Sequence, residues 1–274
     1  MKDRFVTQTN YDAKGARKVT TRTTKRPAGT PTWFDLATPN LEGAKAFYQK
    51  VFGWEYFDTG ADFGNYNMAL SQGRNVAGIG TIFPPDSPQP SAWTIYFASD
   101  DANADTARVK ELGGQVLVDP MVIADSGSMA ICMDPTGAAF GFWQANNHIG
   151  SGAENEHGSM AWFEVNTRDL AAASEFYSKL LNLTTSKVDG TDYLMLQRGD
   201  NMLAGIQQMD ANWEGIPPHW MGYFAVDDAD VAVERAVAAG GKLLVPAFDM
   251  QYGRMAVLSD PYGAAFSIVK LANS

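Results

Sequence analysis

Apolar and polar residues alternate with two different periods along this chain. Residues 32–38 alternate at every second position, which is the pattern of a half-buried strand. Asn40 then supplies a helix N-cap, and Gly53 ends a run with apolar residues at helical spacing: Leu41, Ala44, Phe47, Tyr48 and Val51. Short strand candidates follow at 54–58, 65–71 and 76–82. The pattern therefore predicts one strand, one helix and three further strands, in that order.

The same order of elements recurs after a proline-rich segment at residues 84–90. The pattern predicts a strand at 92–98 and a helix at 101–112, which two glycines close. Three more strands are predicted, near 115–123, 128–134 and 138–145. Two βαβββ units thus follow each other in the first half of the chain.

The second half of the chain repeats the first. Residues 33–41 match residues 162–170, and the Asp-Pro-Thr-Gly-Ala-Ala-Phe segment at 134–140 returns as Asp-Pro-Tyr-Gly-Ala-Ala-Phe at 260–266. The offset between the copies drifts only slightly, which indicates one duplicated domain with small loop deletions. The period is far too long for a solenoid. Any site that this domain builds should therefore exist twice.

Length and composition agree with a duplication. At 274 residues, with 45% hydrophobic and 19% charged residues, the chain resembles a soluble globular protein of two domains. We expect a basic tail at 1–30, domains at 31–146 and 159–274, and a polar, flexible linker at 147–158. The tail carries a net charge of +6, so the remainder carries −16. A disordered or wrapping arm is the simpler interpretation of this tail, and a polyanion-binding or subunit-clasping arm is the alternative.

These properties exclude several classes of protein. The chain has no apolar run of 18 residues to span a membrane, and no apolar leader is visible at its N-terminus. Its acidic body argues against nucleic acid as a partner. The single cysteine, Cys132, excludes an internal disulfide, and its apolar surroundings suggest a buried, inert thiol. We therefore expect a cytoplasmic protein that binds neither a membrane nor a nucleic acid.

Two motifs add to the repeated βαβββ order. The first helix of each copy carries a Phe-Tyr pair, at 47–48 and 176–177, and an Asp-Pro-x-Gly turn precedes each last strand. With these features, residues 31–270 resemble the glyoxalase/bleomycin-resistance/ring-cleaving-dioxygenase (vicinal oxygen chelate, VOC) superfamily. The linker resembles that of two-domain actinobacterial glyoxalase-like members. The resemblance implies an α+β fold in which two modules form one cupped mixed sheet, with helices outside and a ligand cavity inside.

The resemblance also implies where a divalent metal would bind, with one His, Glu or Gln ligand on each of four strands. The corresponding positions here lack an imidazole or a carboxylate: Trp33, Gly78, Thr94 and Gly141 in the first copy, and Trp162, Gly205, Met221 and Ser267 in the second. The arginine with which the family grips glutathione is replaced by Ala37 and Asn166. We therefore expect no metal and no cofactor.

Strand alternation predicts which residues line the two cups. Phe34 and Leu36 should face the helices, and the intervening residues should face the cup. The ligand-binding candidates selected in this way are Trp33, Thr94, Tyr96, Trp143, Trp162, Gln207, His219, Met221, Tyr223 and Ser267. Small residues surrounded by aromatic ones are typical of a pocket for an aromatic or hydrophobic molecule. The alternative is that each cup is packed shut as ordinary core.

One carboxylate stands at the same place in each copy, Asp35 and Glu164. Burial without a partner would raise the pKa of such a group and make it a general base or a handle for a cationic ligand. The alternative is a structural carboxylate, hydrogen-bonded to the backbone or to Tyr96 or Tyr223. His219 is either a rim residue or an acid–base partner of Glu164.

Three functions stay open on the sequence. We favour a metal-independent protein that binds a small aromatic or hydrophobic molecule in one or both cups, as bleomycin-resistance proteins do. The second hypothesis is a glyoxalase-like lyase or isomerase with Asp35 or Glu164 as its general base. The third is a structural protein with closed cups that associates with other chains. The expected partner is a small molecule, and a homodimer stays open.

Overall fold

In the computed structural model, which describes residues 20–84, 87 and 89–272, the first copy forms one curved sheet with two helices on its outer side. Its elements are β2 (Pro31–Thr38), α1 (Leu41–Phe52), β3 (Glu55–Asp58), η1 (Ala61–Phe63), β4 (Asn67–Ser71), β5 (Arg74–Thr81), β6 (Ala92–Ser99), α2 (Ala102–Glu111), β7 (Gln115–Ile123), β8 (Gly127–Met133) and β9 (Ala139–Ala145). The strand order is β3-β4-β5-β2-β6-β9-β8-β7. Each βαβββ unit thus supplies one half of the sheet.

The second copy repeats this arrangement. Its elements are β11 (Met160–Thr167), α3 (Leu170–Leu181), β12 (Thr184–Lys187), β13 (Tyr193–Arg198), β14 (Asn201–Gln208), η2 (Ala211–Trp213), β15 (His219–Ala225), α4 (Ala229–Ala238), β16 (Lys242–Met250), β17 (Gly253–Ser259) and β18 (Ala265–Leu271). The strand order β12-β13-β14-β11-β15-β18-β17-β16 matches that of the first sheet. The predicted α+β fold with tandem duplicated domains is confirmed.

Each of the helices α1 to α4 begins after a residue whose side chain caps its N-terminus. The side chain of Asn40 accepts a hydrogen bond from the backbone of Gly43, and Gly53 ends α1 in the left-handed conformation. The Phe-Tyr motif of α1, Phe47 and Tyr48, is buried on the face that the helix turns inward. Aspartates cap the three other helices in the same way. The apolar face of each helix is thereby held against the sheet.

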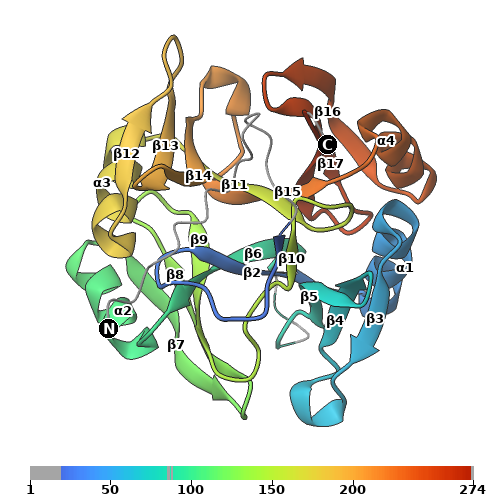
Figure 1. Ribbon diagram of the computed structural model, residues 1–274, viewed down its shortest axis with the longest axis horizontal. Helices are drawn as coiled ribbons and strands as arrows, with labels where there is room; N and C mark the ends of the chain where they lie inside the picture. The colour runs from blue at the N-terminus through green and yellow to red at the C-terminus, as the bar shows by residue number, and fades with distance from the viewer. Residues whose placement is uncertain (1–19, 85–86, 88, 273–274) are drawn as a thin grey trace, which may run out of the picture.

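The two sheets pack back to back. The ring of Phe34 on β2 stacks on Trp93 at a centroid distance of 4.7 Å and lies 5.6 Å from Phe224 of the second copy. One apolar cluster therefore contains residues of both copies. Figure 1 shows α1 beside α4 on one flank and α2 beside α3 on the other. The concave faces of the two sheets consequently open in opposite directions.

Buried hydrogen bonds cross this junction. The hydroxyl of Tyr48 accepts a hydrogen bond from Trp93 Nε1 at 2.9 Å and donates to the carboxylate of Asp260 at 3.3 Å. Asp260 is the aspartate of the Asp-Pro-x-Gly turn in the other copy. The second half of the Phe-Tyr motif thus ties α1 to the opposite domain.

The reciprocal contact uses Tyr177 of α3. Its hydroxyl accepts from Trp220 Nε1 and donates to Asp134, both at 2.8 Å. Because unpaired buried polar groups are costly, these two relays hold the domains in one relative orientation. Both family motifs therefore act at the domain junction rather than in the cups.

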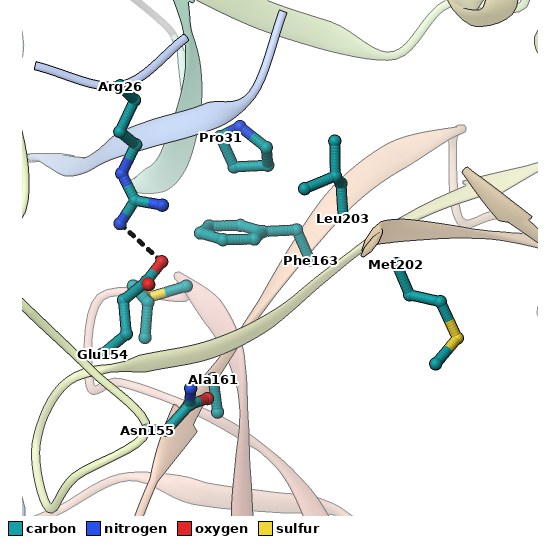
Figure 2. A pocket seen from close by; sticks show the side chains of 9 residues that line it. Arg26, Pro31, Glu154, Asn155, Ala161, Phe163, Met202 and Leu203 are labelled. Atoms are coloured by element: carbon teal, nitrogen blue, oxygen red, sulfur yellow. Dashed lines mark ion pairs between the residues drawn. The ribbon is translucent and has the colours of Figure 1, made fainter. Parts of the chain in front are cut away.

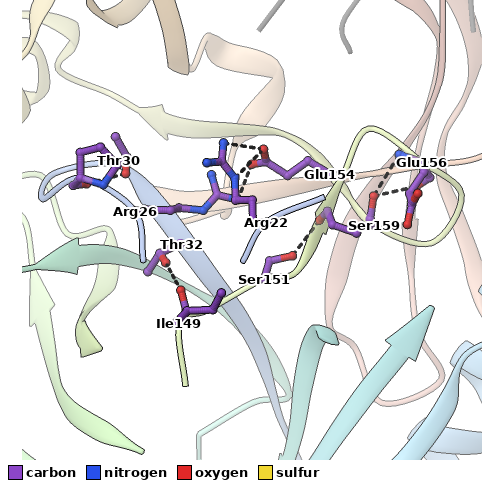
Figure 3. A network of polar contacts seen from close by, with 11 residues as sticks. Arg22, Arg26, Thr30, Thr32, Ile149, Ser151, Glu154, Glu156 and Ser159 are labelled. Carbon is purple, nitrogen blue, oxygen red and sulfur yellow. Dashed lines mark hydrogen bonds and ion pairs between the residues drawn. The ribbon is translucent and has the colours of Figure 1, made fainter. Parts of the chain in front are cut away.

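The linker and the end of the basic tail are ordered, which corrects the expectation of a flexible linker. The strand β10 (Ala153–Glu154) pairs with both β11 and β1 (Thr20–Thr21). Arg22 and Arg26 both contact Glu154, at 3.0 and 2.5 Å (Figure 3). Burial alone would raise the pKa of Glu154, but the two guanidinium groups hold it below its usual value. Residues 1–19 of the predicted tail lie outside the described residues.

This ion pair borders a small cavity between the tail, the linker and the second sheet. Arg26 and Glu154 form one wall, and Pro31, Phe163 and Leu203 lie opposite (Figure 2). The cavity has a volume of about 30 Å³, which holds one water molecule. The junction is therefore closely packed and offers no room for an organic ligand.

Two further expectations concern the whole chain. Cys132 is buried in the apolar core, as predicted, and burial raises the pKa of its thiol to about 12. No helix among the described residues is long and apolar enough to cross a membrane. Whether the chain forms a homodimer stays open.

Candidate functional site

The concave face of the first sheet encloses a cavity of about 970 Å³. Four of the sequence-predicted residues lie in its wall: Trp33, Asp35, Tyr96 and Trp143. The wall also includes Tyr66, Met68, Met129 and His148. We call this cavity with its lining residues cup 1, and the concave face of the second sheet around Glu164 cup 2. Cup 1 is open space and not the packed core of the alternative interpretation.

Apolar side chains surround the mouth of cup 1. Phe57 of β3 is 62% exposed, Phe63 of η1 is 41% exposed, and Val122 of β7 is 73% exposed. Side chains of this type are usually covered, because exposing them to water is unfavourable. A ligand that fills the cavity would cover them.

The strand register brings Asp35 to the centre of the cup floor. Asp35 on β2 lies between Gly78 of β5 and Thr94 of β6 in the ladder. Tyr96 of β6 lies opposite Trp33. Thr94 therefore faces the same side as Asp35, but it is not among the residues that line the cavity.

A tyrosine that the sequence analysis missed completes this floor. Tyr66 lies beside Gly78, where an added Cβ would come within 1.7 Å of the tyrosine hydroxyl. That hydroxyl accepts a hydrogen bond from Trp33 Nε1 at 2.9 Å and donates to Asp35 at 3.2 Å. Tyr96 is a second hydrogen-bond partner of Asp35. Glycine at position 78 is therefore required to admit the ring of Tyr66.

Cup 2 contains the same four-residue cluster. Trp162 Nε1 donates to the hydroxyl of Tyr193 at 2.8 Å, and the hydroxyl of Tyr223 donates to Glu164 at 3.1 Å. Tyr193 is also a partner of Glu164, and it fills the space beside Gly205 as Tyr66 does beside Gly78. We call each group of one tryptophan, two tyrosines and one acid a carboxyl cluster.

Both carboxyl groups have unusual acidities. Burial raises the pKa of Asp35 to about 7, although hydrogen bonds from Tyr96 and Tyr66 act in the opposite direction. Burial raises the pKa of Glu164 to about 7 in the same way, against Tyr193 and Tyr223. The pKa values of the four tyrosines lie well above their usual value, because burial disfavours the phenolate. Each cluster can therefore exchange one proton near neutral pH, and the acid is the group that does so.

The residues at the family's metal positions do not fit a divalent metal. In cup 1 the hydroxyl of Tyr66 occupies the space beside Gly78, and indole, hydroxyl and glycine replace the expected imidazole and carboxylate ligands. In the described part of the chain, no three His, Cys, Asp or Glu side chains lie close enough together to hold an ion.

His148 of the linker also lines cup 1. Its ring meets Trp33 edge-on at 4.4 Å and Trp143 at 5.4 Å. The indole of Trp143 donates to the backbone carbonyl of His148 at 2.7 Å. Burial lowers the pKa of His148 to about 4, so the imidazole is neutral at pH 7.

Cup 2 carries a polar row at the place where cup 1 has small residues. Asn166 of β11 lies between Gln207 and His219 in the ladder. His219 Nδ1 is 2.8 Å from the carbonyl of Pro217, and its Nε2 is 3.3 Å from the amide of Asn166. The ring nitrogens of His219 thus contact Pro217 and Asn166 rather than Glu164.

The remaining candidates of cup 2 lie around Glu164. Met221 is opposite Glu164 in the ladder and is 7% exposed. Ser267 is opposite Tyr223 and is fully buried. The structure therefore brings these residues to one concave face, and their role in ligand binding stays a prediction.

Tyr66 and Tyr193 could have been found from the sequence. They are related by the same spacing as the Val-Ala-Gly-Ile and Leu-Ala-Gly-Ile segments at 76–79 and 203–206. The recurrence of this tyrosine and of the glycine at one repeat spacing was therefore a usable signal.

Comparison with protein families agrees with this geometry. The family model described as Glyoxalase/Bleomycin resistance protein/Dioxygenase superfamily matches residues 30–142, and the one described as Glyoxalase-like domain matches residues 162–269. The chain belongs to the glyoxalase/bleomycin resistance protein/dioxygenase superfamily. The resemblance read from the motifs is therefore confirmed in both copies.

Two relatives of this superfamily cover almost the whole chain. CFP32 of Mycobacterium tuberculosis, provisionally named a glyoxylase, is 43% identical over 89% of this chain and 95% of its own length. The anthracycline biosynthesis protein DnrV of Streptomyces peucetius is 37% identical over 90% of this chain and 95% of its own length. The two-domain organisation is thus shared with these relatives.

Solved superfamily structures share the fold at low sequence identity. The Mn(II)-bound glyoxalase from Novosphingobium aromaticivorans has a TM-score of 0.63 at 17% identity, over 89% of this chain and 82% of that one. A variant of 4-hydroxymandelate synthase from Streptomyces coelicolor has a TM-score of 0.60 at 13% identity, over 90% and 93%. Both show the common architecture and nothing about the ligand of this chain.

Proposed function

We propose that this protein binds a small aromatic or hydrophobic molecule in cup 1, without a metal ion. The observation that carries the proposal is the cavity of about 970 Å³, whose wall combines aromatic rings, methionines and one central carboxyl group. Concave, mainly apolar cavities of this size with few polar groups are the usual sites for small organic ligands. On the sequence grounds given above, we propose that binding takes place in the cytoplasm.

The composition of the wall supports an aromatic ligand in particular. Trp33, Tyr66, Tyr96 and Trp143 surround the floor, and Phe57 and Phe63 stand at the mouth. Aromatic rings pack favourably against one another in stacked or edge-on geometry. The name of the relative DnrV links it to the biosynthesis of anthracyclines, which are planar ring systems. A ligand of related shape would suit this wall.

The donor set supports binding without a metal. The positions at which the superfamily holds a metal offer this chain no imidazole and no carboxylate, and Tyr66 fills the space of one of them. Asp35 is held by two phenol hydroxyls instead of a cation. We infer that the carboxyl cluster takes the place of the metal as the polar floor of the cup.

Titration of the full chain with the neutral probe N-phenyl-1-naphthylamine tests this proposal. The expected result is saturable binding with equal affinity before and after treatment with EDTA, and native mass spectrometry should show the complex without a retained metal. Binding that is lost with EDTA and restored by one equivalent of manganese, nickel, zinc or iron would contradict metal independence. Failure of the probe to bind either form would contradict the proposed cavity function.

One observation favours a second function, an isomerase or lyase. The pKa of Asp35 is raised to about 7, so the carboxylate is a stronger base than an ordinary aspartate and is still ionised in part of the molecules at neutral pH. It could remove a proton from carbon beside a carbonyl group and return it to the neighbouring atom. Such a transfer breaks one C–H bond and forms another bond to hydrogen, and it needs no oxidant or metal.

Deuterium exchange separates the enzyme from the binder. An enzyme of this type should incorporate solvent deuterium into the aromatic hydroxyketone 2-hydroxyacetophenone in D₂O. Asp35→Asn should then lower the exchange rate by about 100-fold or more while the ketone still binds. If the wild-type chain does not raise the exchange rate above the uncatalysed rate, the enzyme hypothesis is wrong and only the binding function remains.

A further inference from the structure

Cup 1 has an uneven distribution of charge. Its lining residues include two aspartates, Asp35 at the floor and Asp62 at the mouth, and neither lysine nor arginine. The one imidazole in the wall, that of His148, is neutral at pH 7 because burial lowers its pKa to about 4. The wall therefore carries only negative charge.

The hydrogen bonds at the floor leave Asp35 as an acceptor. Trp33 Nε1 donates to Tyr66, so the single proton of the Tyr66 hydroxyl is directed to Asp35. Tyr96 is the second partner of this carboxyl group. Both partners are neutral, and in the described part of the chain no ion pair forms with Asp35. A buried carboxylate of this kind is stabilised most by a positive charge.

The rings around this carboxyl favour the same type of ligand. An ammonium group over the face of a tryptophan or tyrosine ring is attracted by the π electrons, most strongly where water is excluded. Cup 1 supplies two indoles and two phenols next to Asp35. A neutral ligand would gain contacts with the rings but no ion pair, and an anionic ligand would be repelled by the carboxylate.

We propose that the ligand of cup 1 is an organic cation, an aromatic or apolar molecule that carries a positively charged nitrogen, with Asp35 as its counter-ion. This inference rests on the proposed binding function and names the ligand class of the same site. The carboxyl cluster is then a receptor for charge, with the two tyrosines as positioning residues that direct the carboxylate toward the cavity.

Binding of a cation to this site depends on pH. The groups that face Asp35 are Tyr66, Tyr96, His148 and, at the mouth, Asp62. The tyrosines and His148 do not change charge between pH 6 and 8, since the pKa values of the tyrosines lie well above 10 and that of His148 lies near 4. Asp35, with a pKa of about 7, ionises in this range. The affinity for a permanent cation should therefore rise about tenfold from pH 6 to pH 8.

A matched pair of probes tests the inference on the full chain. The first is (2-naphthylmethyl)trimethylammonium, which is charged at every pH, and the second is the neutral 2-naphthalenemethanol. At pH 8 the ammonium compound should bind at least about tenfold more tightly than the alcohol in calorimetric titrations, and the ratio should shrink at pH 6. Met129→Trp, which blocks the cavity, assigns the measured binding to cup 1.

Two variants isolate the charge of the floor. Asp35→Asn should abolish the preference for the ammonium compound and its pH dependence while the alcohol still binds. Asp200→Asn makes the same chemical change at an exposed turn and should preserve the preference. Circular dichroism confirms that both variants are folded.

The outcomes separate the two proposals. An alcohol that binds as tightly as the ammonium compound at pH 8 would overturn the cation inference and leave the binding function intact. A wild-type chain that binds neither probe would overturn the proposed function itself. Because both outcomes are read on the wild-type chain, an Asp35 variant that fails to fold does not weaken the test.

Discussion

The two cups share a floor and differ at the rim. Each has a carboxyl cluster with the same donors in the same order, and each acid has a pKa of about 7. Ala37 of cup 1, however, corresponds to Asn166 of cup 2, where Gln207 and His219 complete a polar row. The two copies therefore share one kind of polar floor and differ in the residues around it.

The walls differ as well. Trp33 and Tyr96 of cup 1 are at most 5% exposed, and Trp143 and the linker residue His148 stand over them. In cup 2, Val269 takes the place of Trp143 in the repeat, and it packs with Leu271 and Met255 instead. Both cups therefore have aromatic rings at the floor, and only cup 1 adds the aromatic rings of Trp143 and His148, where cup 2 has aliphatic side chains.

The largest expected effect comes from filling one cup and not the other. Met129→Trp places an indole in the cavity of cup 1 and should weaken binding of N-phenyl-1-naphthylamine by about 100-fold, because the ligand and the new ring compete for the same space. Met255→Trp makes the matched change in cup 2 and should alter this affinity less than twofold. Fluorescence titration measures both. Equal losses in the two variants would show that the probe does not distinguish the cups.

A second effect concerns the junction, where the copies should behave alike. Tyr177→Phe removes the hydroxyl between Trp220 and Asp134 and should lower the free energy of unfolding by about 2 kcal/mol. Tyr48→Phe should cost somewhat less, because its bond to Asp260 is longer, 3.3 Å against 2.8 Å. Urea denaturation of both variants provides the comparison. No loss in either would mean that the relays do not hold the domains together.

The third effect is a pH dependence that the two floors share. The folded chain keeps the Asp35 and Glu164 protons up to pH of about 7, whereas their usual pKa values are 3.8 and 4.5. The folded state therefore binds more protons than the unfolded state in this range, and stability falls as the pH rises from about 4 to about 7.

Asp35→Asn and Glu164→Gln should each remove one half of this pH dependence. Relative to the wild type, each variant should lose about 2–3 kcal/mol less of its free energy of unfolding between pH 5 and pH 8. Denaturation curves at the two pH values measure this change. A smaller loss in only one variant would show that the floors are not equivalent.

The smallest effect is expected at the rim. Asn166→Ala removes the hydrogen bond to His219, but it also removes a buried amide oxygen without a partner in the described residues. The two terms oppose each other, so the free energy of unfolding should change by less than about 1 kcal/mol. Thermal unfolding measures the change. A larger loss of stability would mean that the row of Asn166, Gln207 and His219 holds the fold together. A negligible change would mean that it does not.

The element order followed closely from the sequence. The helix predicted at 101–112 forms at Ala102–Glu111, and the strand predicted at 115–123 forms at Gln115–Ile123, because the apolar period and the capping residues act locally. The alternation also placed Trp33, Asp35 and Tyr96 on one face. Contacts within one strand or across one ladder were thus predictable.

Parts of cup 1 depend on contacts between separate segments of the chain, although the repeat spacing marks Tyr66 as a residue of interest. Tyr66 precedes β4 at the end of a loop, and its reach into the floor depends on the missing side chain at Gly78. His148 belongs to a segment with the composition of a flexible linker, yet Trp33 and Trp143 hold its ring. Neither contact follows from the local sequence, because both join residues from separate elements.

The back-to-back packing of the sheets affects how a ligand could pass from one cup to the other. A molecule released from one concave face enters bulk water on the side away from the other, with a solid aromatic partition around Phe34 and Phe224 between them. The two domains share one hydrophobic core, but their concave faces are separate from each other. A compound handled by both must leave the protein and return to it.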